Sequence, residues 1–354
     1  MKLDEFGWSS SLDEQFRARA GAGLGPARVV ATYTHLYRLV TAEGEKLGSV
    51  SGRLRHVARG PQDFPATGDW VVAELRSGDD RATIHDVLPR ASCFSRRAAG
   101  ARAEEQVVAA NVDTVFLVAG LDGDFNPRRV ERALVLSWES GASPVVVLTK
   151  ADLCADVAAR RQEMEAAAAG VPVVVTSAST GEGVEDLGAH LVRGRTVALL
   201  GSSGVGKSTL VNRLLGYDRQ RTLTVRESDD RGRHATTFRE LIPLPSGALV
   251  IDTPGLREIQ LWAGEESLGD AFADVAERAS ACRFRDCRHE GEPGCAVQAA
   301  VDAGTLDPAR LASYHKLGRE LRHLEIRQDV GLQQAQKARW KSIHKQARKH
   351  RPRE

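Results

Sequence analysis

The stretch GSSGVGKS, residues 201–208, decides the fold because of what lies on either side of it. An apolar run, TVALLG at 196–201, precedes it, and a stretch with helical character begins at Lys207. The spacing G-x-x-x-x-G-K-[ST] between a strand and a helix is that of a phosphate-binding loop, or P-loop. Its glycines let backbone N–H groups converge on phosphate oxygens, and the helix N-terminus adds partial positive charge. We therefore predict that Lys207 reaches the β- and γ-phosphates of a nucleotide and that Ser208 binds its Mg²⁺.

Apolar runs alternate with helical stretches on both sides of the P-loop. Continuous apolar runs with intervening helices indicate an α/β domain whose mostly parallel sheet is covered on both faces. Ligands of such sheets bind beyond the carboxyl ends of the strands. The predicted strands are 114–120, 144–149, 171–178, 196–201 and 248–255, and the predicted helices lie near 127–139, 155–169 and 183–192 and from 207 onward.

The sequence DTPG, residues 252–255, follows an apolar strand about 45 residues after the P-loop. A carboxylate at this place can hold Mg²⁺ through water, and a glycine N–H can meet the γ-phosphate. Alone, DTPG would be an ordinary turn. Together with the P-loop, it predicts Asp252 as a magnesium-binding residue and Gly255 as a sensor of the γ-phosphate.

Two further motifs predict that the base is guanine. TKAD, residues 149–152, resembles the N/T-K-x-D motif, in which the carboxylate of Asp152 accepts hydrogen bonds from N1–H and the exocyclic amine of guanine. Adenine lacks this pair of donors, and the wrong base leaves the carboxylate unpaired. The stem of Lys150 can cover one face of the ring. Ser177 and Ala178, at the end of the next strand, resemble the loop whose backbone N–H meets guanine O6.

The order of these motifs is unusual, because the guanine motifs precede the P-loop. Ordinary GTPases carry the P-loop first, then the switch regions, then the guanine-reading loops. The same sheet can close here if the chain is circularly permuted, with the former ends joined near 185–196. DTPG then leads directly into the following domain, so a nucleotide-dependent shift could be transmitted to that domain mechanically.

The N-terminal region has a different pattern. Residues 1–25 predict a short helix and a glycine-rich linker, and residues 28–88 hold about five short β-type runs broken by Gly, Asp and Pro. This pattern fits a small barrel, of the oligonucleotide-binding (OB) type or of the SH3-like type. Tyr33, Tyr37 and Trp70 could stack on bases, although burial in the core is the commoner role of such aromatic residues.

Three of the five cysteines cluster with a histidine in CRFRDCRHEGEPGC, residues 282–295. In a long chain without an export signal, such clustering favours a metal site over disulfides. Three thiolates and one imidazole complete a tetrahedral Zn²⁺ shell with no position open for water, so the predicted site is structural. Cys93 and Cys154 stand apart and are expected to be ordinary thiols. The predicted zinc ligands are Cys282, Cys287, His289 and Cys295.

Length and composition are those of a multidomain globular protein. At roughly 100–200 residues per domain, 354 residues predict two or three domains. The 42% hydrophobic and 27% charged residues exclude global disorder and a fibrous protein. No apolar run approaches 18 residues and the N-terminus is acidic, so we expect a soluble, cytoplasmic protein without a membrane partner.

The C-terminal stretch 316–354 carries twelve Lys or Arg residues against four acidic residues, although the formal charge of the whole chain is only +2. Such asymmetry indicates a polyanionic partner, most often nucleic acid. The alternative is a solvated helix that only keeps the protein in solution. The residues expected to grip RNA phosphates are Arg339, Lys341, Lys345, Arg348 and Lys349.

The permuted order, the sequence GRHATT at 232–237 and the cysteine cluster together resemble the bacterial RsgA (YjeQ/YloQ) family of GTPases that depend on the small ribosomal subunit. The resemblance covers nearly the whole chain. It implies a multidomain protein: an OB-like β-barrel, a circularly permuted α/β P-loop GTPase domain and a small zinc-binding α domain with a basic tail. It also implies late maturation of the 30S subunit through binding to 16S rRNA. We expect a monomer with domains at 1–98, 99–265 and 266–354.

GRHATT lies where switch I belongs, between the P-loop and DTPG. Thr236 or Thr237 can close on Mg²⁺ when a γ-phosphate is present, and the sequence does not decide between them. The family usually has Thr at the position of Ala235, so the local pattern of hydroxyls differs. Leu256 follows DTPG where many GTPases carry a water-orienting Gln. The resemblance points to His234 instead, and its alternative is an exposed loop histidine; slow turnover stimulated by a partner is expected.

The expected site residues follow from these motifs. The catalytic residues are His234, Lys207 and Thr237. The magnesium-binding residues are Ser208, Thr236, Thr237 and Asp252. The GTP-binding residues are Thr149, Lys150, Ala151, Asp152, Ser177, Ala178, Gly201, Ser202, Ser203, Gly204, Val205, Gly206, Lys207, Ser208, Thr209, Asp252 and Gly255.

Two other functions compete with a GTPase. A non-hydrolysing RNA-binding assembly factor could hold GTP only as a structural ligand. A P-loop kinase is disfavoured, because TKAD and DTPG would have no role in it.

Overall fold

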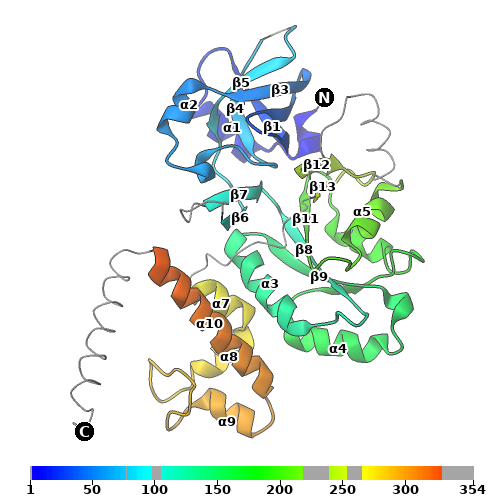
Figure 1. The fold of residues 1–354 in the computed structure, drawn as a ribbon, viewed down its shortest axis with the longest axis vertical. Coiled ribbons are helices and arrows are strands. Elements are labelled where there is room, and N and C mark those ends of the chain that lie inside the picture. The colour runs from blue at the N-terminus through cyan, green and yellow to red at the C-terminus, as the bar shows by residue number, and fades with distance from the viewer. Residues whose placement is uncertain (1, 77, 98–104, 218–238, 253–264, 329–354) are drawn as a thin grey trace, which may run out of the picture. The chain divides into compact units, whose positions relative to one another are not determined.

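Residues 1–260 and 261–354 form two separate units in the computed structural model (Figure 1). The structure describes residues 2–76, 78–97, 105–217, 239–252 and 265–328. The first unit holds the barrel and the nucleotide-binding sheet, and the second holds the cysteine cluster. The expected three-domain boundaries stay a prediction.

The N-terminal barrel closes in the order β1-β2-β3-β5-β4-β1. The β3–β5 pair is parallel and the other pairs are antiparallel. A short helix, α2 (Gly52–Val57), comes between β3 and β4. This five-stranded arrangement confirms the OB-like barrel and excludes the SH3-like alternative, which has no parallel pair of this kind. The strands are β1 (Leu24–Thr32), β2 (Tyr37–Thr41), β3 (Gly44–Val50), β4 (Trp70–Leu75) and β5 (Arg81–Val87).

The barrel core explains two of the three aromatic residues considered for base stacking. Tyr37 and Trp70 are buried, whereas Tyr33 is 37% exposed. Trp70 lies edge-on to Trp8, with ring centroids 4.8 Å apart. Trp8 comes just before helix α1 (Ser10–Arg17), which follows the 3-10 helix η1 (Leu3–Phe6). Tyr37 and Trp70 therefore belong to the core, and of the three only Tyr33 is exposed.

The nucleotide-binding sheet continues from the barrel in the order β12-β13-β11-β8-β9-β10. All its neighbouring strands are parallel except the pair β12–β13. This confirms the mostly parallel sheet. The strands are β8 (Thr114–Gly120), β9 (Ser143–Thr149), β10 (Val173–Val175), β11 (Thr196–Leu200), β12 (Arg239–Pro243) and β13 (Leu249–Asp252).

Helices cover both faces of this sheet. On one face, Leu210 and Leu215 of α5 pack with Phe116 and Val118. On the other face, Leu136 of α3 faces Leu117 and Leu200 across a pocket. The predicted helix near 183–192 is instead a 3-10 helix, η4 (Glu185–His190), which corrects that expectation. The α-helices are α3 (Pro127–Ser140), α4 (Val157–Ala167) and α5 (Lys207–Leu215).

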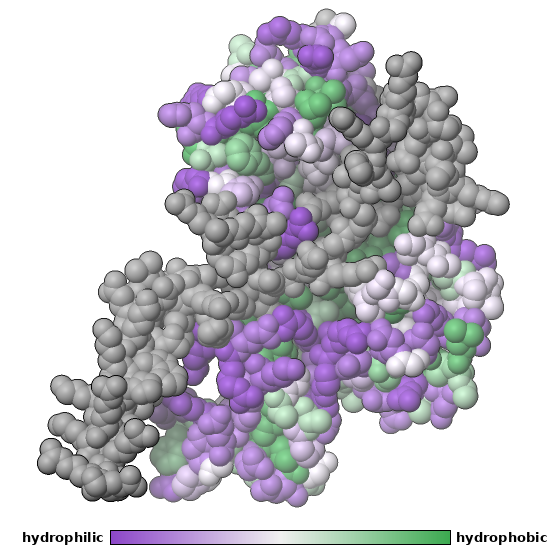
Figure 2. Space-filling model, viewed as in Figure 1, coloured by the Kyte–Doolittle hydropathy of each residue, from purple (hydrophilic) through white to green (hydrophobic). Residues whose placement is uncertain are grey.

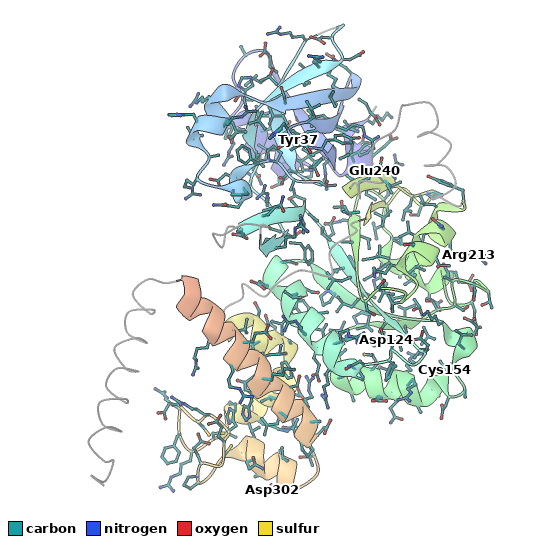
Figure 3. All side chains as sticks on the ribbon, in the orientation of Figure 1. Tyr37, Asp124, Cys154, Arg213, Glu240 and Asp302 are labelled. Carbon is teal, nitrogen blue, oxygen red and sulfur yellow. The ribbon has the colours of Figure 1, made fainter. Side chains whose placement is uncertain are left out.

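Strand β12 joins the barrel to this sheet. It pairs with β1 through Ala31 opposite Glu240 and Thr32 opposite Arg239. Arg38 of the barrel forms an ion pair with Glu240, labelled in Figure 3. The barrel and the sheet therefore share one continuous set of hydrogen-bonded strands.

A buried arginine reinforces the junction. Arg28 of β1 donates to the carbonyl oxygen of Phe6 and to Thr196 Oγ1, both at 3.1 Å. Its guanidinium lies 4.9 Å from the ring centroid of Trp70. Burial lowers the pKa of Arg28 to about 10, which is still well above neutral pH, so the group stays charged. One cation thus links the N-terminal segment, the barrel and β11.

A hairpin between the barrel and the sheet was missed in the sequence. Strands β6 (Cys93–Arg97) and β7 (Glu105–Ala110) pair in antiparallel fashion. The first strand, CFSRR, has charged and polar residues, and the second has only the short apolar run VVAA at 107–110. The expected boundary between residues 98 and 99 lies at the start of the segment 98–104, outside the described residues.

The second unit is helical. Its core contains Phe272, Val275, Val297 and Leu321. The guanidinium of Arg310 donates to Asp274 at 2.6 and 2.7 Å and fixes the start of α10 against α8. The helices are α7 (Glu265–Ala271), α8 (Ala273–Ala279), α9 (Ala296–Asp302) and α10 (Pro308–Gln328).

The described helices include none that is long and apolar enough to cross a bilayer. Hydrophilic residues cover much of the visible surface of both units (Figure 2). The basic residues proposed for the tail, from Arg339 onward, lie outside the described part of the chain.

Candidate functional site: a nucleotide pocket and a metal centre

The P-loop connects β11 to α5, as predicted. A Cβ atom at Gly201 would lie 2.4 Å from the carbonyl oxygen of Val118, so only glycine fits. Gly206 has a φ of 100° and caps the N-terminus of α5. Lys207 Nζ donates to the carbonyl oxygens of Gly201, at 2.7 Å, and Ser202, at 2.6 Å. The ammonium therefore lies against its own loop, where it can be offered to phosphate oxygens.

The first turn of α5 completes the phosphate side of the pocket. Ser208 and Thr209 are exposed at the helix N-terminus, and Val205 is buried beneath the loop. The exposed hydroxyls are free of the core and can meet a ligand at the positive end of the helix dipole.

A buried threonine brings the guanine motif to the P-loop. Thr149, at the end of β9, is 1% exposed, and its Oγ1 donates to the carbonyl oxygen of Val205 at 2.6 Å. Strands β9, β8 and β11 are neighbours, so the carboxyl ends of β9 and β11 meet at one edge of the sheet. Residues 149–152 and 201–208 therefore lie together despite their separation in sequence.

The base-reading residues are also assembled. Ser177 Oγ donates to Asp152 Oδ1 at 2.6 Å, and this hydrogen bond lowers the pKa of the aspartate. Asp152 is therefore ionised at neutral pH and able to accept hydrogen bonds. Ala151 N donates to the carbonyl oxygen of Thr176 at 3.2 Å, which holds TKAD beside the segment that contains Ala178.

The loop after β10 is held from two directions. Gly181 N donates to the carbonyl oxygen of Ser177 at 2.7 Å. Arg213, from the last turn of α5 and labelled in Figure 3, donates to the carbonyl oxygen of Thr180 at 3.2 Å. The helix that follows the P-loop thus also steadies the loop expected to meet the guanine ring.

Several predicted residues cannot be placed. The backbone of Asp252 ends β13, opposite Glu240 of β12. His234, Thr236, Thr237 and Gly255 lie outside the described residues. Their catalytic and magnesium-binding roles stay predictions.

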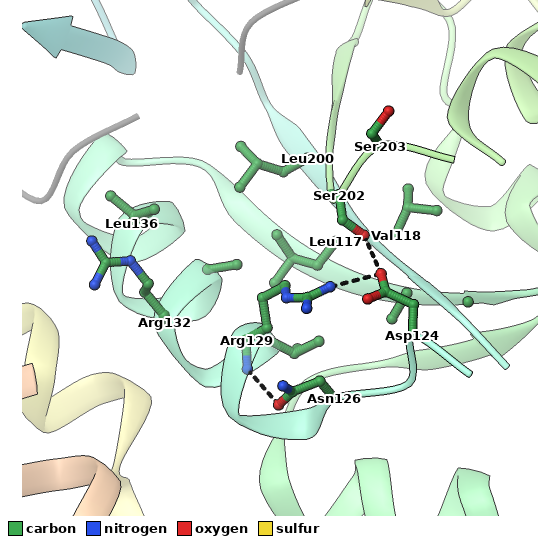
Figure 4. A pocket seen from close by; sticks show the side chains of 15 residues that line it. Leu117, Val118, Asp124, Asn126, Arg129, Arg132, Leu136, Leu200, Ser202 and Ser203 are labelled. Atoms are coloured by element: carbon green, nitrogen blue, oxygen red, sulfur yellow. Dashed lines mark hydrogen bonds and ion pairs between the residues drawn. The ribbon is translucent and has the colours of Figure 1, made fainter. Parts of the chain in front are cut away.

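The structure adds two acidic residues that the sequence analysis missed. Asp122 and Asp124 follow β8, and they form hydrogen bonds with Lys150 and Ser202 respectively. Figure 4 shows Asp124 between Ser202 and Arg129. Their place at the carboxyl end of a predicted strand, beside the strand that carries the P-loop, was the available signal.

The cysteine cluster has the dimensions of a tetrahedral metal shell. The four ligand atoms all lie within 4.8 Å of one another. His289 Nδ1 is 3.6 Å from Cys282 Sγ and 3.4 Å from Cys295 Sγ, and the two sulfurs are 4.0 Å apart. Zn–S bonds of about 2.3 Å and Zn–N bonds of about 2.1 Å require edges of about 3.8 Å and 3.6 Å. Cys282, Cys287, His289 and Cys295 therefore fit one structural Zn²⁺.

The surrounding loop is built to hold these ligands. Cys295 caps α9, with its Sγ accepting a hydrogen bond from Gln298 N at 3.3 Å. Glu292 accepts hydrogen bonds from the backbone N–H groups of Arg288, at 2.9 Å, and Glu290, at 2.8 Å. Burial lowers the pKa of His289, so the imidazole is neutral and has a lone pair for a metal.

Comparisons with known proteins agree with this geometry. The family model described as RsgA GTPase matches residues 87–262. A small ribosomal subunit biogenesis GTPase RsgA from Opitutus terrae is 50% identical, over 97% of this chain and 96% of the relative. Its counterpart from Syntrophotalea carbinolica is 44% identical, over 99% of this chain and 98% of the relative.

Two solved structures have a similar fold. YjeQ from Thermotoga maritima matches with a TM-score of 0.65 and 28% identity, over 84% of this chain and 98% of that chain. YloQ, described as a circularly permuted GTPase, matches with a TM-score of 0.60 and 26% identity, over 86% and 98%. With the P-loop following TKAD and the Cys3His cluster in the second unit, the chain belongs to the RsgA GTPase family.

Proposed function

We propose that this chain binds GTP with Mg²⁺ at the P-loop, hydrolyses it, and acts in the maturation of the small ribosomal subunit. The hydrogen bond from Thr149 to the P-loop carbonyl of Val205 carries the proposal, because it holds a guanine-type motif beside a phosphate-binding loop. Membership of the RsgA GTPase family supports hydrolysis, and the names of the curated relatives support a role in subunit biogenesis.

In this pocket the protein groups have separate tasks. Asp152 selects guanine by accepting hydrogen bonds from N1–H and the exocyclic amine. Lys207 and the P-loop amides stabilise the charge that develops as water attacks the γ-phosphate in line. Bound Mg²⁺ would neutralise charge on the β- and γ-oxygens. Its proposed ligands, directly or through water, are Ser208, Asp252 and one of Thr236 and Thr237.

The attacking water needs a partner other than glutamine, because Leu256 follows DTPG. We propose that His234 supplies it when switch I closes over the phosphate, with Thr237 beside it. Catalysis that depends on such a closure is slow in the free protein and rises when a partner stabilises the closed state.

The proposed partner is the 30S subunit, through its 16S rRNA. The OB-like barrel presents Tyr33 at its surface, and the chain carries a basic stretch at 316–354. Contacts made mainly to phosphates weaken steeply with salt. We propose that the protein acts as a monomer in the cytoplasm, where small subunits are assembled.

Phosphate release with and without purified 30S subunits tests the proposal. We expect slow release of phosphate from GTP by the free protein and a large increase when 30S subunits are added. A non-hydrolysing assembly factor that keeps GTP as a ligand would release none under either condition, and that result would reject hydrolysis.

Replacing Asp152 by Asn tests the base-reading site. The amide donates where the carboxylate accepts, so D152N should prefer xanthine over guanine nucleotides. Asp152 is exposed in the structure, and the exchange of an acceptor for a donor opposite the base should change relative affinity by about tenfold to a hundredfold. Competition binding with GDP and xanthosine diphosphate measures the reversal, and an unchanged preference would remove Asp152 from this role.

A further inference from the structure

The loop between β8 and α3, residues 121–126 (LDGDFN), belongs to none of the motifs above but is fixed beside both halves of the pocket. At its start, Leu121 N donates to the carbonyl oxygen of Thr149 at 2.8 Å. At its end, Asn126 caps α3 and accepts a hydrogen bond from Arg129 N at 3.3 Å. The aspartates between these anchors therefore have defined positions.

Asp122 holds the lysine of the guanine motif. Lys150 Nζ is 2.6 Å from Asp122 Oδ2, and both side chains are 28% exposed. Gly120 leaves room for this carboxylate, since a Cβ atom there would lie 2.8 Å from Asp122 Oδ1. The hydrogen bond from Lys150 also lowers the pKa of Asp122, which keeps the carboxylate charged at neutral pH. The ammonium of Lys150 is thus tethered, and its stem has a fixed direction.

Asp124 holds the P-loop. Ser202 Oγ donates to Asp124 Oδ2 at 2.6 Å, and Arg129 Nη1 donates to the same oxygen at 2.7 Å (Figure 4). The positive charge of Arg129 offsets a carboxylate that would otherwise repel phosphates. Asp124 N donates to Asp122 Oδ1 at 3.1 Å, so the two aspartates form one hydrogen-bonded unit.

From these contacts we infer that Asp122 and Asp124 are positioning residues for nucleotide binding, Asp122 acting through Lys150 on the purine and Asp124 acting through Ser202 on the phosphates. The inference rests on the proposed function. It adds to the Thr149 contact a second, more exposed connection between the two halves of the pocket. Neither aspartate is placed in contact with the nucleotide itself.

A double-mutant cycle tests whether Asp122 acts through Lys150 on the purine. The four proteins are the wild type, D122A, K150A and the double variant, and the measurement is the Kd for a fluorescent GDP analogue. We expect D122A to raise Kd about five- to tenfold, the size of one ordinary hydrogen bond, because the pair with Lys150 is partly exposed to water. If Asp122 acts through Lys150, the double variant binds no more weakly than K150A alone. D122A should also keep the wild-type preference for GDP over xanthosine diphosphate, because Asp152 is untouched.

A second cycle, with D124A, S202A and their double variant, tests whether Asp124 acts through Ser202 on the phosphates. The matched control is E165A, which removes an exposed acidic residue of α4 that pairs with Arg161 at 2.7 Å on the surface. E165A should bind GDP as the wild type does. Effects that add in the double variants, or a Kd unchanged in D122A and D124A, would overturn the inference. Failure of the wild type to bind guanine nucleotides would reject the proposed function instead.

Discussion

Replacing Thr149 by Val isolates the contact that joins the guanine motif to the P-loop. Valine has almost the same shape as threonine, so the packing at the end of β9 is kept while the hydroxyl is lost. Thr149 is 1% exposed and Val205 is 2% exposed, so water cannot replace the hydroxyl at the Val205 carbonyl without a local opening. The change removes the hydrogen bond of 2.6 Å to the Val205 carbonyl together with a longer contact of 3.4 Å to the carbonyl oxygen of Ala119 on β8, and the shorter bond is the one that joins the two motifs.

The expected cost follows from that burial. Leaving a buried acceptor without its partner costs about 1–3 kcal/mol. We therefore expect T149V to lower the free energy of unfolding of the first unit by about 1–3 kcal/mol. Nucleotide binding should weaken as well, by about fivefold if holding the two loops together costs about 1 kcal/mol. Both GDP and GTP should be affected, since the contact lies between the base side and the phosphate side.

Urea unfolding and titration with a fluorescent GDP analogue measure the two effects. The matched control is T114V, at the opposite end of the neighbouring strand β8, where the threonine is only half-buried and far from the P-loop end of the sheet. T114V should change both quantities little. If T149V unfolds and binds like T114V, the contact does not hold the two motifs together and the reasoning from burial is wrong.

Three further results are expected. Removing zinc with a chelator, or replacing Cys282 by Ser, should lower the metal content, measured by atomic emission, from one zinc per chain. Either change should also speed hydrogen exchange in the helices of the second unit. Helices that stay fully protected without metal would contradict a structural role. Burial raises the pKa of the Cys93 thiol to about 11. Because the thiolate is the reactive form, the rate at which Cys93 is alkylated, measured by mass spectrometry, should still rise between pH 9 and pH 11. A rate that levels off near pH 9 would refute this. The same pKa shift destabilises the folded state at high pH, because the thiol of the unfolded chain ionises near its ordinary pKa. This contribution to the free energy of unfolding is fully present below about pH 9 and is lost as the pH rises toward 11. In urea unfolding, C93A should not show this loss.

The parts of the fold that the sequence predicted well are those set by local pattern. The apolar run at 114–120 is β8 and the helix expected near 127–139 is α3, within one residue at its end. Both follow from continuous burial and from a helix that begins at Asn126 and Pro127. The cysteine spacing likewise predicted the four ligand atoms that the second unit brings together.

The parts that were missed depend on partners distant in sequence. Strand β12, Arg239–Pro243, has charged residues and a proline, and it exists as a strand because β1 and β13 lie on either side of it. The pattern of short β-type runs alone left the barrel type open, and only the family resemblance pointed to the OB type, because the distinguishing feature is the parallel pairing of β3 with β5. The contact of Asp122 with Lys150 could not be read from the sequence, because the two residues are 28 apart and come close only when β8 and β9 pair.

The pairing of β1 with β12 has a consequence for any attempt to study the hydrolytic part alone. A chain shortened to residues 99–265 would lose Ala31 and Thr32, and β12 would become an edge strand with unpaired backbone N–H and C=O groups. Exposed edge strands pair with strands of other molecules. The isolated fragment should therefore self-associate, whereas in a chain that keeps the barrel β1 pairs with this edge.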